Sequence, residues 1–261
     1  MSLLEQASSD EKGPLVATIV GAAGTGKTSL AATFPKPFMI KTQGERVPDD
    51  SPFCPKSIGI TETSESLWNQ LKALLHDQHD YETLIIDSVT GLESMFVQEV
   101  IASDQKAKGI NQALGGYGAG PAAVAAGHMR VRKAVELLRT KRGMNTVFLA
   151  HADISRIDPP DTEGFNQYTL RLSNKSIAPY VDSVDLVGFL KQATILLGEG
   201  ENKKAKTTGD IVLVTYLTPS SVAKNRLGIR DDIEVKHGEN PLAEYLPTSS
   251  KPKTEAKKET A

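Results

Sequence analysis

A glycine-rich segment near the N-terminus has the residue types and the spacing of a phosphate-binding loop. Residues 21–29 read Gly-Ala-Ala-Gly-Thr-Gly-Lys-Thr-Ser and satisfy the pattern G-x-x-x-x-G-K-[ST]. Glycines let the backbone wrap closely enough for successive N–H groups to point at phosphate oxygens. In such a loop Lys27 reaches the β- and γ-phosphates, and the Thr28 hydroxyl is a ligand of Mg²⁺. The residues expected to bind ATP are Gly21, Ala22, Ala23, Gly24, Thr25, Gly26, Lys27, Thr28 and Ser29.

The alternative for this segment is a glycine-rich turn between a strand and a helix that binds nothing. The surrounding sequence favours the phosphate loop, because a β-branched apolar run precedes it and a helical pattern follows it.

An acidic residue follows a second apolar run. Residues 83–86 read Thr-Leu-Ile-Ile and deliver Asp87 to the carboxyl end of a strand, where ligands of open α/β sheets gather. In ATPases with such a loop, an acid at this position holds Mg²⁺ through water. Thr28 and Asp87 are therefore the expected metal ligands. The alternative role for Asp87 is to cap the helix that follows it.

The residue that would orient an attacking water is less well defined, because no Glu directly follows Asp87. Gln43 and Glu45 follow a short strand, and either can face the γ-phosphate or be a solvated loop residue. His151 follows another strand, at a position from which a polar side chain senses the γ-phosphate. A partly buried structural role is the alternative for His151.

Strand and helix patterns alternate through the first part of the chain. Alternating strands and helices predict an α/β fold with a mostly parallel central sheet covered by helices on both faces. The expected strands are residues 15–20, 38–40, 83–87 and 146–150, and the expected helices are residues 27–34, 64–76, 89–102 and 120–142.

The last third has strand patterns without intervening helices. Residues 185–190, 194–197 and 210–217 are separated by turn residues, notably Gly198–Asn202. They predict antiparallel strands appended to the sheet near the C-terminus.

The composition fits one globular domain with loose ends. The chain has 261 residues, of which 39% are hydrophobic and 24% charged. Residues 13–246 are expected to form the domain, residues 1–12 a flexible N-terminus and residues 247–261 a disordered tail, because neither end carries enough apolar side chains to fold.

Charge and cysteine content exclude other classes. A net charge of −2 gives the whole molecule no strong attraction for nucleic acid, so any such contact must be local. The single cysteine, Cys54, excludes a cysteine-based metal site. We assign no chemistry to Cys54, Ser88 or Trp68, which suit packing or helix capping. No apolar run approaches the roughly 18 residues of a membrane span, so we expect no membrane association and a cytoplasmic location.

Taken together, these segments resemble the RecA-like branch of P-loop ATPases, and most closely a family of phage-encoded ATPases associated with single-strand annealing and recombination. The resemblance implies a core that binds ATP and Mg²⁺, contacts single-stranded DNA, and forms a homo-oligomer with ATP at subunit interfaces. It adds a single-strand DNA-binding protein as a further expected partner, in the host cell cytoplasm if the chain is phage-encoded. The likeness covers residues 15–245 and is carried by residues 21–35, 84–88, 143–151 and 222–228.

Residues 224–228, Lys-Asn-Arg-Leu-Gly, resemble the Lys-Asn-Arg-Phe-Gly motif of RadA-type members. In those proteins basic side chains approach the ATP of the neighbouring subunit, which implies such a role for Lys224 and Arg226. An exposed basic turn is the alternative. RecA-like proteins commonly place a Glu where this chain has Gln43, so hydrolysis is expected to be slow or differently arranged. Annealing or partner loading is favoured over strand exchange, since no separate DNA-binding domain is evident.

Two loop-like segments are the expected DNA contacts. Residues 111–120 are rich in glycine and carry Tyr117, and residues 153–168 carry Arg156, Phe165 and Tyr168. A basic group beyond the first segment, formed by Arg130, Arg132 and Lys133, is either a further contact or a solvated helix face.

The expected function is a Mg²⁺-dependent, DNA-stimulated ATPase acting on single-stranded DNA in phage recombination, annealing or replication. Alternatives are another ATP-driven DNA motor or loader, related to helicases or packaging, a small-molecule kinase, and a nucleotide-binding scaffold that does not hydrolyse ATP. A kinase is disfavoured because the chain lacks an arginine-rich lid.

Overall fold

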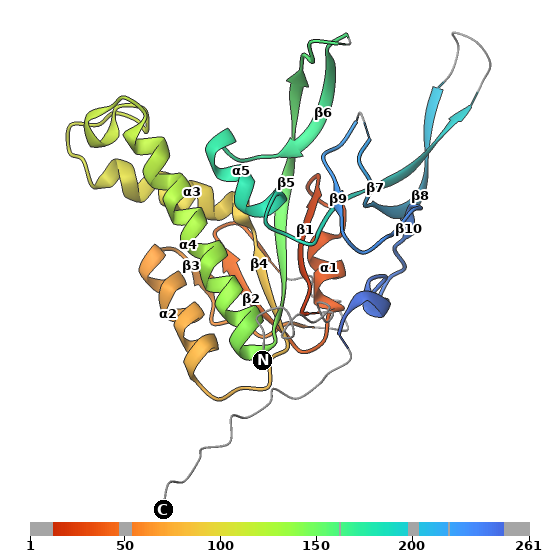
Figure 1. Cartoon of the computed structure of the whole chain (residues 1–261), viewed down its shortest axis with the longest axis horizontal. Helices are drawn as coiled ribbons and strands as arrows, with labels where there is room; N and C mark the ends of the chain where they lie inside the picture. The colour runs from red at the N-terminus through yellow and green to blue at the C-terminus, as the bar shows by residue number, and fades with distance from the viewer. Residues whose placement is uncertain (1–12, 47–53, 162, 198–203, 219, 248–261) are drawn as a thin grey trace, which may run out of the picture.

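The computed structural model describes residues 13–46, 54–161, 163–197, 204–218 and 220–247. These residues form an α/β structure around a central sheet of ten strands (Figure 1). Eight strands follow the order β10-β8-β7-β1-β5-β4-β2-β3, while β6 pairs with β5 and β9 pairs with β7. The strands are β1 (Val16–Gly21), β2 (Pro37–Thr42), β3 (Ile60–Thr61), β4 (Thr83–Asp87), β5 (Asn145–Ile157), β6 (Phe165–Leu170), β7 (Leu186–Leu197), β8 (Lys204–Val214), β9 (Lys224–Asn225) and β10 (Ile233–Glu234).

Helices connect the parallel strands, as the alternating sequence pattern predicted. The helices are α1 (Lys27–Ala32), α2 (Ser64–His76), α3 (Val89–Ala102), α4 (Ala119–Arg142) and α5 (Asn174–Val181), with 3₁₀ turns η2 (Ala113–Gly115) and η4 (Ala243–Tyr245). Strands β3, β2, β4, β5, β1 and β7 run parallel, whereas β8 and β10 continue the sheet in antiparallel order. The α/β fold, its mostly parallel sheet and the antiparallel strands near the C-terminus are therefore confirmed.

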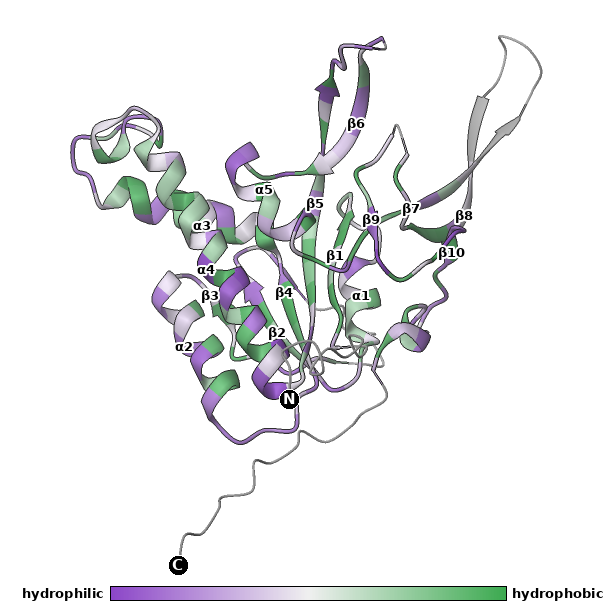
Figure 2. Cartoon of the chain, viewed as in Figure 1, coloured by the Kyte–Doolittle hydropathy of each residue, from purple (hydrophilic) through white to green (hydrophobic). Residues whose placement is uncertain are grey.

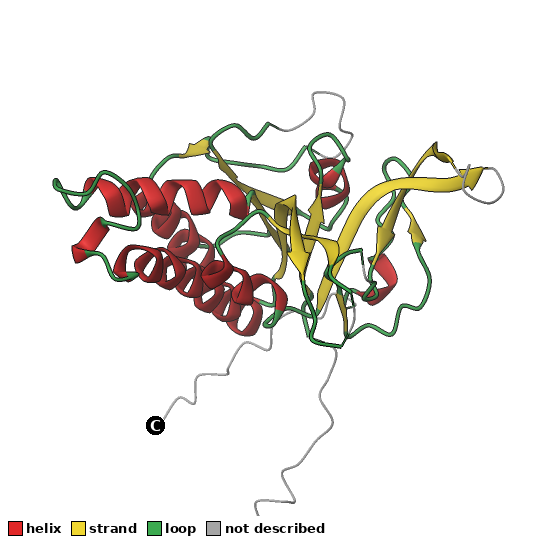
Figure 3. Cartoon of the chain, turned by 90° about the horizontal axis from the view of Figure 1, so that it is seen from above, coloured by secondary structure: helices red, strands yellow, loops and turns green. Residues whose placement is uncertain are grey.

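Alternation along the strands divides the core into two layers. Val16 and Val20 of β1 pack with α2 to α5 on one face, and Ala17 and Ile19 pack with α1 and the C-terminal segment on the other. Figure 3 shows most of the helices gathered on one side of the sheet, and Figure 2 shows hydrophobic residues along its central strands. The predicted cover on both faces is present, but α1 shares the second face with the segment that carries Leu242.

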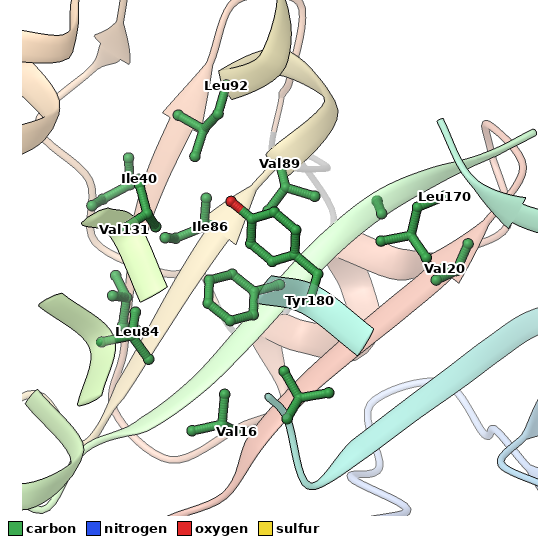
Figure 4. Close-up of a cluster of buried hydrophobic side chains, with 14 of the residues drawn as sticks. Val16, Val20, Ile40, Leu84, Ile86, Val89, Leu92, Val131, Leu170 and Tyr180 are labelled. Atoms are coloured by element: carbon green, nitrogen blue, oxygen red, sulfur yellow. The ribbon is translucent and has the colours of Figure 1, made fainter. Parts of the chain in front are cut away.

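A buried hydrogen-bonded group joins three helices to the sheet. Tyr180 of α5 lies among the apolar side chains between the sheet and helices α2 to α5 (Figure 4). Its hydroxyl is 2.6 Å from Nδ1 of His128 in α4. Nε2 of His128 is 2.7 Å from Oε2 of Glu93 in α3, and Oε1 of Glu93 accepts a bond from the Ser173 backbone before α5. The Thr18 hydroxyl of β1 donates to the Tyr180 carbonyl at 2.7 Å. These bonds fix α5 relative to β1, because each buried polar group has a partner.

The largest difference from the sequence prediction lies in residues 153–168, which were expected to form a loop. Strand β5 instead continues to Ile157 and pairs with β6 as an antiparallel hairpin, from Ala152↔Leu170 to Ile157↔Phe165. Ala152 and Leu170 at its base are buried, but beyond them the hairpin projects from the body of the sheet (Figure 1), and residues 153–157 are exposed or only partly buried. It therefore lacks the apolar alternation by which a half-buried strand is recognised.

Smaller differences concern strand breaks and a short helix. The segments expected at 185–190 and 194–197 form one strand, β7, with an irregularity between Gln192 and Thr194. Helix α5 was not predicted, because it is short and contains Pro179. Helix α1 ends at Ala32, two residues earlier than expected. The expected flexible N-terminus (1–12), the turn at 198–202 and residues 248–261 of the expected tail lie outside the described residues.

We expect Tyr180→Phe to lower the free energy of unfolding by about 1–3 kcal/mol, because it leaves a buried ring nitrogen of His128 without its partner. Urea denaturation measures the change. Tyr117→Phe is the matched control, since Tyr117 is fully exposed and should leave the midpoint unchanged. Equal midpoints for both variants would contradict the stabilising role of the buried group.

Candidate nucleotide-binding and catalytic site

The glycine-rich loop leaves the carboxyl end of β1 and leads directly into α1. Gly24 and Gly26 have φ values of 75° and 87°, a left-handed conformation that glycine adopts without steric cost. A Cβ at Gly21 would lie 2.8 Å from both the Leu190 carbonyl oxygen and Oγ1 of Thr25. The loop conformation thus requires glycine at these positions, as the motif indicated.

Lys27 lies under this loop and is 6% exposed. Its Nζ donates to the carbonyls of Gly21 at 3.0 Å and Ala22 at 2.8 Å. Burial lowers the pKa of Lys27, and the carboxylates of Asp87 and Glu45 oppose that effect. The ammonium group is therefore held against the loop by its carbonyls, and a phosphate bound in the loop can replace those bonds.

Thr28 and Asp87 meet as expected for a Mg²⁺ site. The Thr28 hydroxyl donates to Oδ2 of Asp87 at 2.7 Å. Burial raises the pKa of Asp87 to about 6, and the bond from Thr28 opposes it. Two oxygen donors side by side fit Mg²⁺, which keeps several waters and binds through one or two carboxylates plus substrate phosphates. Within the described residues no cluster of His, Cys, Asp and Glu forms a complete metal site, so the remaining ligands would be water and phosphate.

Glu45 reaches the carboxyl ends of β4 and β5 from the loop after β2. Its Oε1 accepts bonds from Nε2 of His151 at 3.0 Å and from the Ser88 hydroxyl at 2.9 Å. The bond to His151 lowers the pKa of Glu45, burial opposes this, and the Ser88 bond and the charge of Lys27 lower it further. An ionised carboxylate beside the phosphate loop has the chemistry of a general base.

The two candidates for the water-orienting residue occupy different environments. Gln43 is exposed, whereas Glu45 is half-buried and hydrogen-bonded within the site. Gly44 has a φ of 90° and separates them, so the chain turns between the two residues. The structure therefore brings Glu45, and not Gln43, together with Asp87 and His151.

Thr42 of β2 fixes the backbone of Asp87 and Ser88 at the end of β4. Its Oγ1 accepts a bond from the Ser88 backbone N–H at 2.9 Å and lies 3.2 Å from the Asp87 carbonyl oxygen. A Cβ at Gly91 would lie 2.0 Å from Thr42 Oγ1, so α3 approaches β2 as closely as only glycine allows. This close approach sets where Ser88 and Asp87 stand relative to the loop that carries Glu45.

A pocket of about 410 Å³ adjoins the other side of the phosphate loop. Its size suits a nucleoside, and it combines apolar side chains with polar groups. It is lined on one side by α1, on the other by β8 and the segment from Glu234 to Glu239, and its lining includes Thr25, Ser29, Leu30, Asp210, Ile211 and His237. Apart from Thr25 and Ser29, these residues carry no motif that would have marked them in the sequence.

Lys224 and Arg226 lie away from the phosphate loop of their own chain. In the sheet register Lys224 pairs with Val187 near the start of β7, whereas Leu190, further along β7, neighbours Gly21. Lys224 Nζ donates to the carbonyl of Asp182, and Arg226 lies 3.7 Å from a carboxylate oxygen of Asp185. Arg226 remains largely exposed, so its guanidinium is open to another molecule.

The basic group expected beside the glycine-rich segment does not form one surface. Arg130 stacks over the ring of Trp68 at 4.4 Å, whereas Arg132 donates to the carbonyl of Ser183. Residues two positions apart on a helix point about 200° apart, which separates the two guanidinium groups. Lys133 is exposed. Arg130 and Arg132 therefore have different local partners, and a DNA contact by this group stays a prediction.

The other expected DNA-contacting residues are solvent-accessible. Tyr117 is fully exposed at the tip between α3 and α4, beside Leu114, and both residues have positive φ. In the β5–β6 hairpin, Arg156 pairs with Asp158, and Tyr168 stacks on Phe189 with part of its ring exposed.

Some site residues were missed or assigned only packing and capping roles from the sequence. Ser88 caps α3 by accepting from Gly91, as expected, but it also donates to Glu45. Thr90 accepts from the His151 backbone. Arg171 follows β6 and contacts β5, and no motif marks an arginine in that position. Cys54 is exposed, so packing does not explain it.

Comparison with known proteins gives one family. A family model described as an AAA domain matches residues 14–227, which include the glycine-rich loop, Glu45, Asp87 and His151. Curated proteins give no match to the chain. Among the described residues, no helix combines the length and the apolar character that crossing a membrane requires.

We expect Gly91→Ala to lower the free energy of unfolding by about 1–3 kcal/mol, because the added methyl group overlaps Thr42 and must displace it. Thermal or urea denaturation measures the loss. Gly109→Ala is the control, because a methyl group there meets nothing within 4 Å. A Gly91 variant as stable as the Gly109 variant would show that α3 and β2 can separate at no cost.

Proposed function

Because the chain belongs to the family of AAA-domain P-loop ATPases, we propose that it hydrolyses ATP with Mg²⁺ and does so while bound to single-stranded DNA, in phage recombination, annealing or replication. The observation that carries the proposal is the convergence of Lys27, the Thr28–Asp87 pair and the Glu45–His151 pair at one edge of the sheet. Each of these groups matches a part that phosphoryl transfer to water requires.

The residues of the site divide the work between binding and proton transfer. Lys27 exchanges its bonds to loop carbonyls for bonds to the β- and γ-phosphates. Thr28 and Asp87 would hold Mg²⁺, which when bound would neutralise phosphate charge. Glu45, whose pKa is lowered first of all by its bond to His151, orients the attacking water and accepts its proton.

The pocket beside α1 gives the nucleoside its place. It begins at Thr25 and Ser29 on the side of the loop away from Glu45. A nucleotide lying across the loop thus has its base in this pocket and its γ-phosphate toward Glu45 and His151. The presence of Glu45 in the site favours hydrolysis over a scaffold that only binds nucleotide.

Two projecting elements support contact with single-stranded DNA. The tip that carries Tyr117 and the β5–β6 hairpin with Arg156 both extend beyond the carboxyl ends of the parallel strands (Figure 1). An exposed aromatic ring stacks on bases without sequence preference, and arginine adds attraction to the backbone phosphates. The hairpin is continuous with His151 through β5, which links DNA contact to the site.

We expect wild-type protein to hydrolyse ATP faster with single-stranded DNA than without it, in a steady-state phosphate-release assay at low salt. Glu45→Gln should lower kcat by about 10²–10⁴-fold while ATP binding persists, because it removes the base but keeps the side-chain shape. Lys27→Ala should abolish both turnover and tight ATP binding.

Gln43→Ala is the matched comparison in that assay. It should leave turnover near the wild-type rate, because Gln43 is exposed. A loss of turnover in Gln43→Ala with none in Glu45→Gln would make Gln43 the water-orienting residue. Turnover that ignores DNA would remove the DNA-dependent part of the proposal and leave an ATPase.

Oligomers with ATP at subunit interfaces give a second expectation. Arg226, exposed and distant from its own loop, would then act on the ATP of a neighbour. Lys27→Ala and Arg226→Ala proteins should each be inactive alone. Mixed in equal amounts, they should recover up to about one quarter of wild-type turnover, because random assembly places an intact loop beside an intact arginine at that fraction of interfaces. Hydrolysis assays of the mixture test this, and an additive, inactive mixture would argue against action across an interface.

A further inference from the structure

Arg171 lies where the β5–β6 hairpin returns to the sheet. Its backbone N–H donates to the His151 carbonyl at 2.8 Å, directly after the pair Ala152↔Leu170. His151 is in register with Gly21, the first residue of the phosphate loop. Arg171 is thus anchored to the residue of β5 that neighbours the phosphate loop.

The side chain of Arg171 is on the phosphate-loop face of the sheet. Ala152 and Leu170 are both buried in the layer covered by α2 to α5. Successive side chains on a strand point to opposite faces, so His151 and Arg171 share the opposite face. That is the face of α1, and His151 confirms it by reaching Glu45.

The guanidinium reaches across β5. Its NH2 group donates to the Ala152 carbonyl at 3.2 Å. Ala152 follows His151, the last residue of β5 that is paired with β1. The charge of Arg171 acts on Lys27, whose pKa it helps to lower. In the described part of the chain no carboxylate pairs with Arg171, so its positive charge is not compensated.

We propose that Arg171 is a catalytic residue of the same chain, which binds the γ-phosphate of ATP from the side opposite Lys27. The inference rests on the proposed ATP site. A guanidinium has five N–H donors, and the contact with Ala152 leaves others free for phosphate oxygens. Its neighbours His151 and Glu45 mark the γ-phosphate end of the site, whereas the nucleoside pocket lies on the other side of the loop.

Such a cation contributes most when charge moves during the reaction. The oxygen of water bonds to the γ-phosphorus while the bond to the bridging oxygen breaks, and that electron pair leaves with ADP. The proton of the water passes to Glu45. Arg171 stabilises the charge on the γ-phosphoryl oxygens. Its hydrogen bonds to His151 and Ala152 connect this contact with the base of the β5–β6 hairpin.

The test compares ATP with ADP, which differ by the γ-phosphate alone. Dissociation constants for both nucleotides, with Mg²⁺ and without DNA, are measured by calorimetry for wild type, Arg171→Gln, Arg171→Lys and Arg142→Ala. Arg142 is the matched control, because it also donates to a backbone carbonyl, that of Asp77, but at the amino end of β5.

Arg171→Gln should weaken ATP about tenfold or more while ADP affinity stays unchanged, because a charge-assisted bond to the γ-phosphate is lost. Arg171→Lys should fall between Arg171→Gln and wild type, and Arg142→Ala should match wild type. In hydrolysis assays Arg171→Gln should also lower kcat.

Three results would overturn the inference. Equal losses for ATP and ADP would show that Arg171 only supports the fold, and unchanged ATP affinity in Arg171→Gln would show that it does not touch the γ-phosphate. Wild-type protein that binds neither nucleotide would overturn the proposed function itself. Intact ATP binding in both wild type and Arg171→Gln removes only the role of Arg171.

Discussion

The register of three parallel strands is the constraint on which the site depends. Asp87 of β4 stands opposite Leu149 of β5, and His151 stands opposite Gly21 of β1. Because side chains alternate between faces, a shift of β4 by one residue along β5 would turn the Asp87 side chain toward helices α2 to α5 and away from Thr28. The buried apolar side chains on both faces prevent that shift, so the core of the sheet also fixes the chemistry at its edge.

Charges at this edge are few, close together and partly removed from water. Burial raises the pKa of Asp87 and lowers that of Lys27, while the bond from His151 keeps Glu45 acidic. Burial favours the neutral form of each group, and the contacts among them oppose that effect. The three groups therefore depend on one another, and the loop holds cationic and anionic partners before any phosphate enters.

The sequence was sufficient for the parts whose signal is local. The phosphate loop follows a fixed spacing, Asp87 ends an apolar strand, and the predicted ends of α2, β4 and α3 match the structure. Glu45 and Gln43 could not be separated from the sequence, because the turn at Gly44 and the contacts to His151 and Ser88 join residues distant in the chain. The hairpin could not be predicted either, since polar strands paired only with each other lack the alternation that burial imposes.

The length of β5 divides the strand into two parts with different tolerance to change. From Thr146 to Leu149 it is paired on both sides, and its side chains fill the core. From Asp153 to Ile157 it is paired only with β6 and lies beyond the buried core. Loop tips with few contacts accept insertions and new sequence more readily than packed strands. The connection between Ile157 and Phe165 can therefore diverge in length and sequence among related chains while the ATP site keeps its geometry.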